Sequence, residues 1–292
     1  MAIDTSQIVE ELKRSRKYRH LCEDTLVRVA AWAAVRAKSQ KDATQKAKRK
    51  LHQVYGAYLE AWDFEHAGRM LGALRPGADP EAARKVCRQI MQQHTSTKER
   101  LGHLDTLYAS LFAITGRPQR ILDVGCGLHP FALPWMELPG EVVYFAWDID
   151  ERVVALVNRF LTMMGSEPHA RCRDVLVSSP TAQADVAFVL KMLPCLEQQE
   201  KGCSVRLLRD INAPFIVVSF PVHSIGGHGK GMRKHYAQMM ENISAELGWR
   251  GVPLEFREEL FFVLHRGRSE ETENRNPLPQ TAVRWDGLPS LR

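Results

Sequence analysis

The sequence predicts an α/β fold with a largely parallel sheet, preceded by an all-helical segment. Two observations support this expectation. Before about residue 110, apolar side chains recur at helical spacings and show few strand-like alternations. From about residue 119, short apolar runs alternate with helical segments, which is typical of parallel strands joined by crossover helices. The 292 residues are enough for one large domain or two ordinary ones.

The first hundred residues predict a helical bundle. Apolar positions recur at helical spacing over residues 26–34 and 51–59. A segment containing proline and glycine, residues 76–80, predicts a loop, and residues 82–91 resume a helix. We therefore expect a helical domain at residues 1–106.

The remaining elements predict one sheet with helices between its strands. The strands are expected at the apolar runs 121–124, 142–147, 186–190 and 215–220, and the helices at 152–164 and 205–211. The run at 260–264 follows residues 254–256 closely enough to form an antiparallel pair at the sheet edge. We place this domain at residues 107–266 and expect a loose, polar, proline-bearing tail at residues 267–292.

The net charge of +6 is concentrated near the N-terminus. Residues 1–100 hold 20 Lys and Arg against 12 Asp and Glu, a balance of +8 that leaves −2 for the rest. One basic cluster alone is usually a solvated helix face, but two clusters on one small unit favour a polyanion-binding module. The clusters are Lys13, Arg14, Arg16, Lys17 and Arg19, and Lys41, Lys46, Lys48, Arg49 and Lys50.

Composition also limits the compartment and the chemistry. No apolar run approaches the roughly 18 residues needed to cross a bilayer, and the first residues lack the basic and apolar regions of a signal peptide. The six cysteines are scattered, with no Cys-x-x-Cys pair and no histidine at zinc-ligand spacing. We therefore expect a cytoplasmic protein with reduced thiols, no membrane association and no bound metal.

The clearest local motif, residues 121–127, is an apolar strand that ends in the acid Asp123 and a Gly-x-Gly turn. Glycines let the backbone turn tightly and approach a nucleotide-like ligand. A dinucleotide-binding loop would have a third glycine at Pro130, so a nicotinamide dehydrogenase is disfavoured. Asp148 follows 21 residues after Gly127, where a carboxylate can accept hydrogen bonds from both ribose hydroxyls, although it could instead cap a helix. The pattern fits an adenosine-type ligand, with S-adenosylmethionine the natural candidate.

Several blocks with consistent order and spacing resemble the aminoglycoside-resistance 16S ribosomal RNA methyltransferases that modify guanine N7. The blocks are residues 94–101 and 104–108, the sequence Cys-Gly-Leu-His-Pro at 126–130, Lys-Met-Leu-Pro at 191–194, Val-Ser-Phe-Pro at 218–221, and the glycine-rich stretch 224–232. The similarity extends from about residue 16 to residue 264. It implies a class I S-adenosylmethionine-dependent methyltransferase with a Rossmann-like, mostly parallel seven-stranded sheet and an N-terminal all-helical domain.

The resemblance also implies roles for individual residues. In similar proteins, the arginine matching Arg100 holds the carboxylate of the cofactor, a task suited to a planar bidentate donor. The resemblance similarly places Asp148 on the ribose, Gly125 against the cofactor backbone, and Asp174 with Val175 near the adenine, although Asp174 could instead cap a helix. The expected cofactor-binding residues are His94, Ser96, Thr97, Lys98, Arg100, Asp123, Gly125, Gly127, Asp148, Asp174, Val175 and Lys191.

Read as local structure, residues 96–99 form a capping box at the start of a helix. In that arrangement the Ser96 hydroxyl and the Glu99 carboxylate satisfy backbone N–H groups. The expected buried face of the helix consists of Leu101, Leu104, Tyr108 and Leu111. A capped helix would also present Arg100 in a fixed direction.

The segment Lys191, Met192, Leu193 and Pro194 follows the fourth strand, where methyltransferases place groups near the reacting methyl. Enzymes that methylate exocyclic amines generally have Asn or Asp followed by two prolines there, and that motif is absent. Guanine N7 carries an exposed lone pair and no proton. We therefore expect no proton-transfer residue, with catalysis resting on alignment of N7 with the methyl group at about 3 Å.

Two other motifs bear on the chemistry. Pro194 with Cys195 resembles the nucleophile of cytosine C5 methyltransferases, although a buried structural cysteine is the simpler interpretation. Residues 226–231 fail the phosphate-loop pattern because Ser or Thr does not follow Lys230, but their cations suit a loop that closes over RNA. Similar proteins carry arginine in the stretch where this chain has His228, which puts one RNA or catalytic contact in doubt. They often carry asparagine at His129, a difference with no obvious consequence for the chemistry.

The expected function is that of a monomeric 16S rRNA (guanine(1405)-N7)-methyltransferase that acts on the assembled 30S subunit and confers resistance to aminoglycosides such as kanamycin and gentamicin. S-Adenosyl-L-methionine would be the cofactor and S-adenosyl-L-homocysteine its product. A methyltransferase for another RNA or base, or a non-catalytic ribosome-binding factor, stays open. The expected RNA-binding residues are Lys13, Arg14, Arg16, Lys17, Arg19, Lys48, Arg49, Lys50, His228, Lys230 and Arg233.

Overall fold

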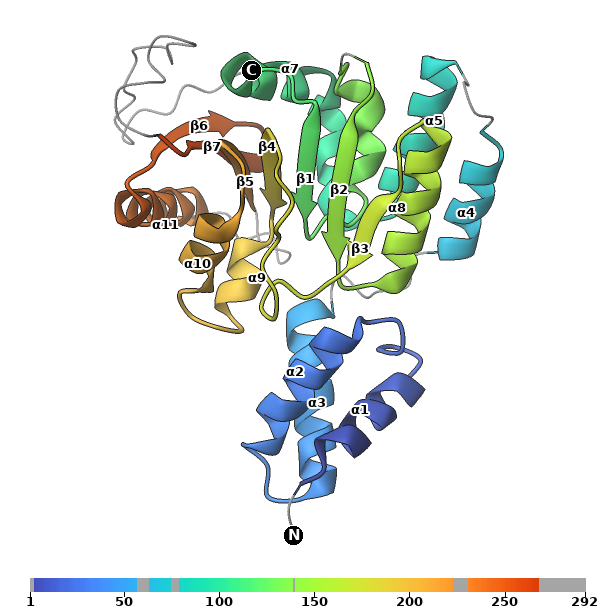
Figure 1. Ribbon diagram of the computed structural model, residues 1–292, viewed down its shortest axis with the longest axis vertical. Helices are drawn as coiled ribbons and strands as arrows, with labels where there is room; N and C mark the ends of the chain where they lie inside the picture. The colour runs from blue at the N-terminus through green and yellow to red at the C-terminus, as the bar shows by residue number, and fades with distance from the viewer. Residues whose placement is uncertain (1–2, 57–62, 75–78, 139, 223–230, 268–292) are drawn as a thin grey trace.

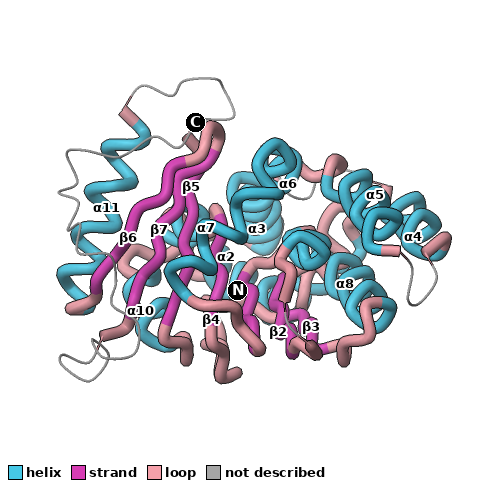
Figure 2. The backbone as a smooth tube through the Cα atoms, turned by 90° about the horizontal axis from the view of Figure 1, so that it is seen from above, coloured by secondary structure: helices cyan, strands magenta, loops and turns pink. Residues whose placement is uncertain are grey.

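The fold is that of a computed structural model, which describes residues 3–56, 63–74, 79–138, 140–222 and 231–267 (Figure 1). A single sheet forms its centre, with helices packed on both faces, and a separate helical bundle lies at one end (Figures 1 and 2). The predicted tail from residue 268 onward and residues 76–78 of the predicted loop lie outside the described residues.

The sheet has seven strands in the order β3-β2-β1-β4-β5-β7-β6. They are β1 (Arg120–Val124), β2 (Val143–Asp148), β3 (His169–Cys172), β4 (Val186–Leu190), β5 (Phe215–Pro221), β6 (Arg250–Glu255) and β7 (Glu259–His265). Strands β1 to β5 pair in parallel, whereas β7 is antiparallel to both β5 and β6. The mostly parallel seven-stranded sheet and its antiparallel edge pair are thereby confirmed.

The central strands are apolar along their whole length because helices cover both faces of the sheet. One face shares its core with α4 (Phe64–Gly72), α5 (Pro80–Met91), α7 (Leu104–Thr115), η2 (His129–Trp135) and α8 (Glu151–Met163). The other face packs against α9 (Leu193–Glu197), α10 (Cys203–Asp210) and α11 (Met232–Leu247). Strand β1 divides its side chains between the two layers, with Ile121 in one core and Leu122 in the other.

The N-terminal helices α1 (Thr5–Arg14), α2 (Glu23–Ala34) and α3 (Gln40–Tyr55) form a bundle with its own apolar core, which includes Leu12, Leu26 and Leu51. In Figure 1 the arrowheads of β1 and β2 point toward this bundle, so it lies at the carboxyl ends of the parallel strands. Helices α1 to α3 pack in the core of the bundle, whereas α4 and α5 pack in a core shared with the sheet. The domain boundary expected at residue 106 therefore lies within a region that already packs on the sheet.

The predicted capping box is wrong. Helix α6 (Thr95–Lys98) begins one residue before Ser96, and the Ser96 hydroxyl pairs with Nδ1 of His94 at 2.8 Å. The Glu99 carboxylate instead contacts the Lys191 ammonium. The chain continues through the 3₁₀ helix η1 (Glu99–His103) into α7. The predicted apolar face is buried at Leu104, Tyr108 and Leu111 and half-buried at Leu101.

Candidate active site

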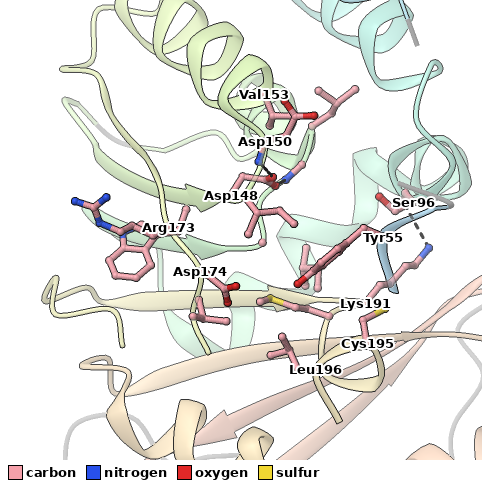
Figure 3. A pocket seen from close by; sticks show the side chains of 18 of the residues that line it. Tyr55, Ser96, Asp148, Asp150, Val153, Arg173, Asp174, Lys191, Cys195 and Leu196 are labelled. Atoms are coloured by element: carbon pink, nitrogen blue, oxygen red, sulfur yellow. Dashed lines mark hydrogen bonds between the residues drawn. The ribbon is translucent and has the colours of Figure 1, made fainter. Parts of the chain in front are cut away.

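A cleft opens at the carboxyl ends of β1, β2 and β4 (Figure 3). Its walls include the turns that follow these strands, the segment after β3, and residues from α3 and α9. Ligands of open α/β sheets bind at this edge, because loops from neighbouring strands separate there.

The turn after β1 needs its two glycines. Gly125 has φ +65° and Gly127 has φ +48°, both in the left-handed region. A Cβ atom at Gly125 would come within 2.6 Å of the Met192 sulfur, so a side chain there would displace the opposite wall of the cleft. Both glycines line the cleft, where their backbone is open to close approach by a ligand.

Asp148 ends β2 and lines the cleft beside this turn. Its Oδ2 accepts a hydrogen bond from the Gly127 N–H at 2.8 Å, and its Oδ1 accepts one from the Asp150 N–H at 3.0 Å. These two backbone groups fix the direction of the carboxylate. Burial raises the pKa of Asp148 to about 6.

Asp123, an expected cofactor-binding residue, does not line the cleft. It is buried beneath the glycine turn, where Oδ2 contacts Nδ1 of His129 at 2.8 Å and accepts from the Tyr144 hydroxyl at 2.9 Å. The Tyr108 hydroxyl pairs with the other ring nitrogen of His129 at 2.9 Å. These partners turn the carboxylate into the protein interior, where it supports the turn from below.

A charge network of Arg100, Glu259, Lys191 and Glu99 lies at the base of the cleft and forms its floor. Arg100 donates to both carboxylate oxygens of Glu259, at 3.1 Å from Nε and 2.7 Å from Nη2. The Lys191 ammonium contacts the Glu99 carboxylate and lies 3.4 Å from Oε2 of Glu259. Burial alone would raise the pKa of Glu259, but the charges of Arg100 and Lys191 hold this pKa below its ordinary value. Together these groups join the segment around residue 100 to the end of β4 and the start of β7.

Lys191 has an unusual backbone as well as an unusual environment. Its φ is +55°, a conformation rare for residues other than glycine. The Lys191 N–H donates to the backbone oxygen of Ser219 at 3.0 Å and to its hydroxyl at 3.1 Å, which holds this bend at the end of β4. The bend places both Lys191 and Met192 on the cleft wall.

His94 lies at the same side of the cleft. Burial, together with the nearby charges of Lys191 and Arg100, lowers the pKa of His94 to about 4. The ring is therefore neutral near pH 7, consistent with its pairing with the Ser96 hydroxyl.

Eight of the twelve expected cofactor-binding residues line the cleft: His94, Ser96, Gly125, Gly127, Asp148, Asp174, Val175 and Lys191. Thr97, Lys98, Arg100 and Asp123 do not. The Thr97 hydroxyl is directed to the backbone oxygen of Met91 at 2.7 Å, and Lys98 is exposed. Arg100 was expected to bind a ligand carboxylate, but its guanidinium is buried against the carboxylate of Glu259.

Of the four residues expected near the reacting methyl group, only two line the cleft. Lys191 and Met192 line the cleft, whereas Leu193 is buried in the core and Pro194 lies in the first turn of α9 outside the lining. Cys195, one residue further on, is half-buried and lines the cleft.

Several lining residues were not predicted as part of the site, and Tyr55 and Gln199 are two of them. Tyr55 comes from the last turn of α3, and Figure 3 shows its side chain directed into the cleft; Gln199 follows α9. The Tyr55 hydroxyl donates to Oε1 of Gln199 at 3.0 Å. Nothing local in the sequence marks them, because Tyr55 reads only as one more apolar position of a helix.

The two basic clusters meet in the bundle. The Lys17 ammonium lies 2.9 Å from Nδ1 of His52, and the Tyr18 hydroxyl donates to the backbone oxygen of Lys48 at 3.1 Å. The expected RNA-binding residues Lys13, Arg14, Arg16, Lys17, Arg19 and Arg49 are exposed, whereas Lys48 and Lys50 are half-buried. Arg233 forms an ion pair with Glu255, and residues 228 and 230 lie outside the described residues.

The described part of the chain contains neither a helix long and apolar enough to cross a membrane nor three His, Cys, Asp or Glu side chains placed to hold a metal ion.

The parallel sheet with its antiparallel β7, the glycine turn after β1 and the acid at the end of β2 define a class I methyltransferase fold. The model of the family described as ribosomal RNA methyltransferase (FmrO) matches residues 14–263, and the chain belongs to this family.

Curated relatives agree with this assignment. The chain is 37% identical over 263 residues to a 16S rRNA (guanine(1405)-N(7))-methyltransferase of Micromonospora rosea, which covers 89% of this chain and 96% of the relative. It is 35% identical to a protein of the same name from Serratia marcescens, over 84% of this chain and 88% of the relative.

Solved structures give the same result. The 16S rRNA methylase RmtB matches with a TM-score of 0.76 and 28% identity, over 91% of this chain and all of the other. The 16S rRNA methyltransferase RmtF, solved in complex with S-adenosyl-L-homocysteine, matches with a TM-score of 0.76 and 30% identity over the same shares of the two chains.

Proposed function

We propose that this chain transfers the methyl group of S-adenosylmethionine to N7 of guanine 1405 in 16S rRNA. The observation that carries the proposal is the cleft at the carboxyl ends of the strands, which joins the glycine turn and Asp148 to the bend at Lys191 and Met192. The printed names of the relatives, and the S-adenosyl-L-homocysteine in the RmtF structure, support this choice of substrate and cofactor.

The residues present fit the cofactor. Gly127 leaves open the space that a Cβ would fill, because the nearest atom there is a His94 ring carbon at 4.0 Å, so a ligand can lie against the backbone of the turn. Asp148 offers a fixed carboxylate to the ribose hydroxyls, and Asp174 with Val175 would border the adenine. S-Adenosylmethionine, when bound, supplies an electrophilic methyl group on a sulfonium.

The chain's own task at N7 is alignment. Guanine N7 already carries a lone pair, so no group needs to remove a proton. The Lys191 ammonium is held by carboxylates and by the backbone oxygen of Ser96 at 3.3 Å, so it acts as a fixed part of the floor. Met192 and Leu190 add apolar surface to the cleft, which favours exclusion of water from the reacting atoms.

The proposal extends to the partner and the biological result. The exposed cations of the bundle would dock on the folded RNA of the assembled 30S subunit in the cytoplasm, with the chain acting as a monomer. In this view residues 1–106 contain the docking surface and residues 107–266 most of the chemistry, while Tyr55, His94 and Ser96 complete the cleft lining. The methyl and its positive charge at the decoding site would confer resistance to aminoglycosides.

The first test is methyl transfer from labelled S-adenosylmethionine to purified 30S subunits and, separately, to free 16S rRNA. Strand cleavage at N7-methylguanine locates the product. We expect label on 30S subunits and cleavage at guanine 1405, both lost in Asp148→Asn because the ribose acceptor is weakened. Cofactor binding without N7 methylation would contradict the proposed reaction, and would point to another RNA or a binding role.

Cys195 provides a control for a second chemistry, because its position on the cleft wall would suit the nucleophile of a cytosine C5 methyltransferase. We expect Cys195→Ser to retain methyl transfer, since N7 methylation needs no thiolate. Loss of transfer with cofactor and RNA binding intact would favour cytosine chemistry instead.

A further inference from the structure

The helical bundle contacts the two turns that carry Asp148 and Asp174 of the cofactor cleft. After β2, the backbone of residues 20–22 pairs with that of residues 149–151: the Cys22 N–H donates to the Ile149 oxygen at 2.7 Å, and the Glu151 N–H to the His20 oxygen at 2.9 Å. These bonds lie next to Asp148 in the chain. The bundle therefore holds the turn that presents the proposed ribose acceptor.

After β3, side chains of α2 hold Asp174. Its Oδ2 accepts from the Thr25 hydroxyl at 2.9 Å, from Arg28 Nε at 2.9 Å and from Arg28 Nη2 at 2.7 Å. Its Oδ1 accepts from the Leu176 N–H at 2.9 Å. The carboxylate is only 2% exposed, so these donors set its orientation within a buried environment.

Arg28 also connects Asp174 to the opposite wall of the cleft. Its Nη2 lies 3.1 Å from the Tyr55 hydroxyl and 3.0 Å from Oε1 of Gln199. One guanidinium thus joins α2, the turn after β3, the end of α3 and the segment after α9. Figure 3 shows Tyr55 and Asp174 both facing the cleft. A displaced bundle would move Tyr55 and release Asp174 together.

We propose that Arg28 is a positioning residue that orients Asp174 for the cofactor and makes the docking bundle part of the cofactor site. Three donors on Oδ2 leave Oδ1, with its one backbone donor, as the oxygen with acceptor capacity for a ligand amine. Because the bundle also carries the RNA-docking cations, cofactor binding and RNA docking strengthen each other. This inference rests on the proposed function for the identity of both ligands.

The test measures binding of S-adenosylhomocysteine to the full chain by titration calorimetry. Arg28→Ala is expected to weaken binding about tenfold, the effect of one misplaced charge-assisted hydrogen bond. Thr25→Val keeps the shape of the side chain, removes one donor to Asp174, and is expected to weaken binding about threefold, so it serves if Arg28→Ala does not fold. Arg36→Ala, which removes an exposed cation just after α2, is the matched control and should bind as the unchanged chain does.

A double-mutant cycle separates positioning from a general loss of structure. If Arg28 acts through Asp174, Arg28→Ala combined with Asp174→Asn should bind the cofactor within about twofold of Asp174→Asn alone. Independent, multiplicative losses would overturn the inference, as would wild-type affinity in Arg28→Ala. Arg28→Lys keeps the positive charge but lacks the forked geometry of the guanidinium. It should bind S-adenosylhomocysteine more tightly than Arg28→Ala but less tightly than the unchanged chain.

The second part of the test measures the linkage between cofactor binding and RNA docking. Saturating S-adenosylhomocysteine should tighten binding of the unchanged chain to 30S subunits, and this gain should disappear in Arg28→Ala but persist in Arg36→Ala. A gain that persists in Arg28→Ala would contradict the linkage. The calorimetry uses no RNA, so its result stands even if the methylated base proves to be a different one, and failure of the proposed function is recognised separately.

Discussion

At the scale of single residues, the cleft is built from charged groups that the fold holds in unusual states. Asp148 is a half-buried carboxylate whose partners are backbone N–H groups, and Lys191 is an ammonium enclosed by Glu99 and Glu259. Arg100 completes this floor through its forked contact with Glu259. The chemistry of the site therefore depends on how each charge is paired as much as on which residues are present.

The raised pKa of Asp148 predicts a pH dependence of cofactor binding. Burial raises this pKa to about 6, so the carboxyl group is protonated at lower pH and loses an acceptor for the ribose. Affinity for S-adenosylhomocysteine should therefore fall roughly tenfold between pH 7 and pH 5. Fluorescence or calorimetric titration across this range measures it. His94, with a pKa of about 4, stays neutral in this window.

Asp148→Asn is the control for that titration. The amide does not ionise, so the variant should bind weakly and with little change between pH 7 and pH 5. An unchanged pH dependence in Asp148→Asn would assign the titration to another group.

The buried pair of Arg100 and Glu259 predicts a large loss of stability when one partner is removed. Both side chains are at most 2% exposed, so Arg100→Met leaves a carboxylate buried with one fewer cation. The free energy of unfolding, from urea denaturation, should fall by about 3–5 kcal/mol. Arg100→Met combined with Glu259→Gln should be more stable than Arg100→Met alone. A loss below about 0.5 kcal/mol would show that the pair adds nothing to folding.

At the scale of elements, the local sequence pattern predicted the strands, turns and helices that depend on neighbouring residues in the chain. Strand β1 and the glycine turn follow from an apolar run with glycines at its end, and helices α5, α8 and α10 lie within about two residues of their predicted bounds. The contacts that shape the cleft floor were not predictable, because Arg100 and Glu259 lie 159 residues apart in the chain. The same holds for Tyr55 and Gln199, 144 residues apart, which meet only when the bundle docks. Pro80, expected in a loop, instead begins α5, where its missing N–H has no cost.

The bundle α1–α3 predicts salt-dependent docking. We expect neutralisation of Lys13, Arg14, Lys17, Lys48 and Arg49 together to weaken 30S binding and to flatten its dependence on salt. Each lost phosphate contact should reduce the slope of log affinity against log salt by about 1. Filter binding at several salt concentrations measures this slope. Unchanged affinity and slope would disprove docking through this surface, and unchanged S-adenosylhomocysteine binding is the control for folding.

At the scale of the whole molecule, the arrangement places docking and chemistry at the same end of the sheet. The bundle lies at the carboxyl ends of the parallel strands, where the cleft opens (Figure 1). The Lys50 ammonium reaches across to the backbone oxygen of Gln198 at 3.2 Å, so a basic cluster lies within contact of the cleft wall. An RNA held by the bundle would need little further movement to present a base.

The position of Glu259 also has a consequence for biosynthesis. Strand β7 inserts between β5 and β6 and is the last of the described strands in chain order, yet its first residue supplies the carboxylate that Arg100 and Lys191 share. During translation, the glycine turn and Asp148 emerge more than a hundred residues before this carboxylate does. The floor beneath the cleft therefore remains incomplete on the nascent chain until the hairpin of β6 and β7 has left the exit tunnel. A chain terminated before β7 would carry Asp148 and Asp174 without the carboxylate that Arg100 and Lys191 share.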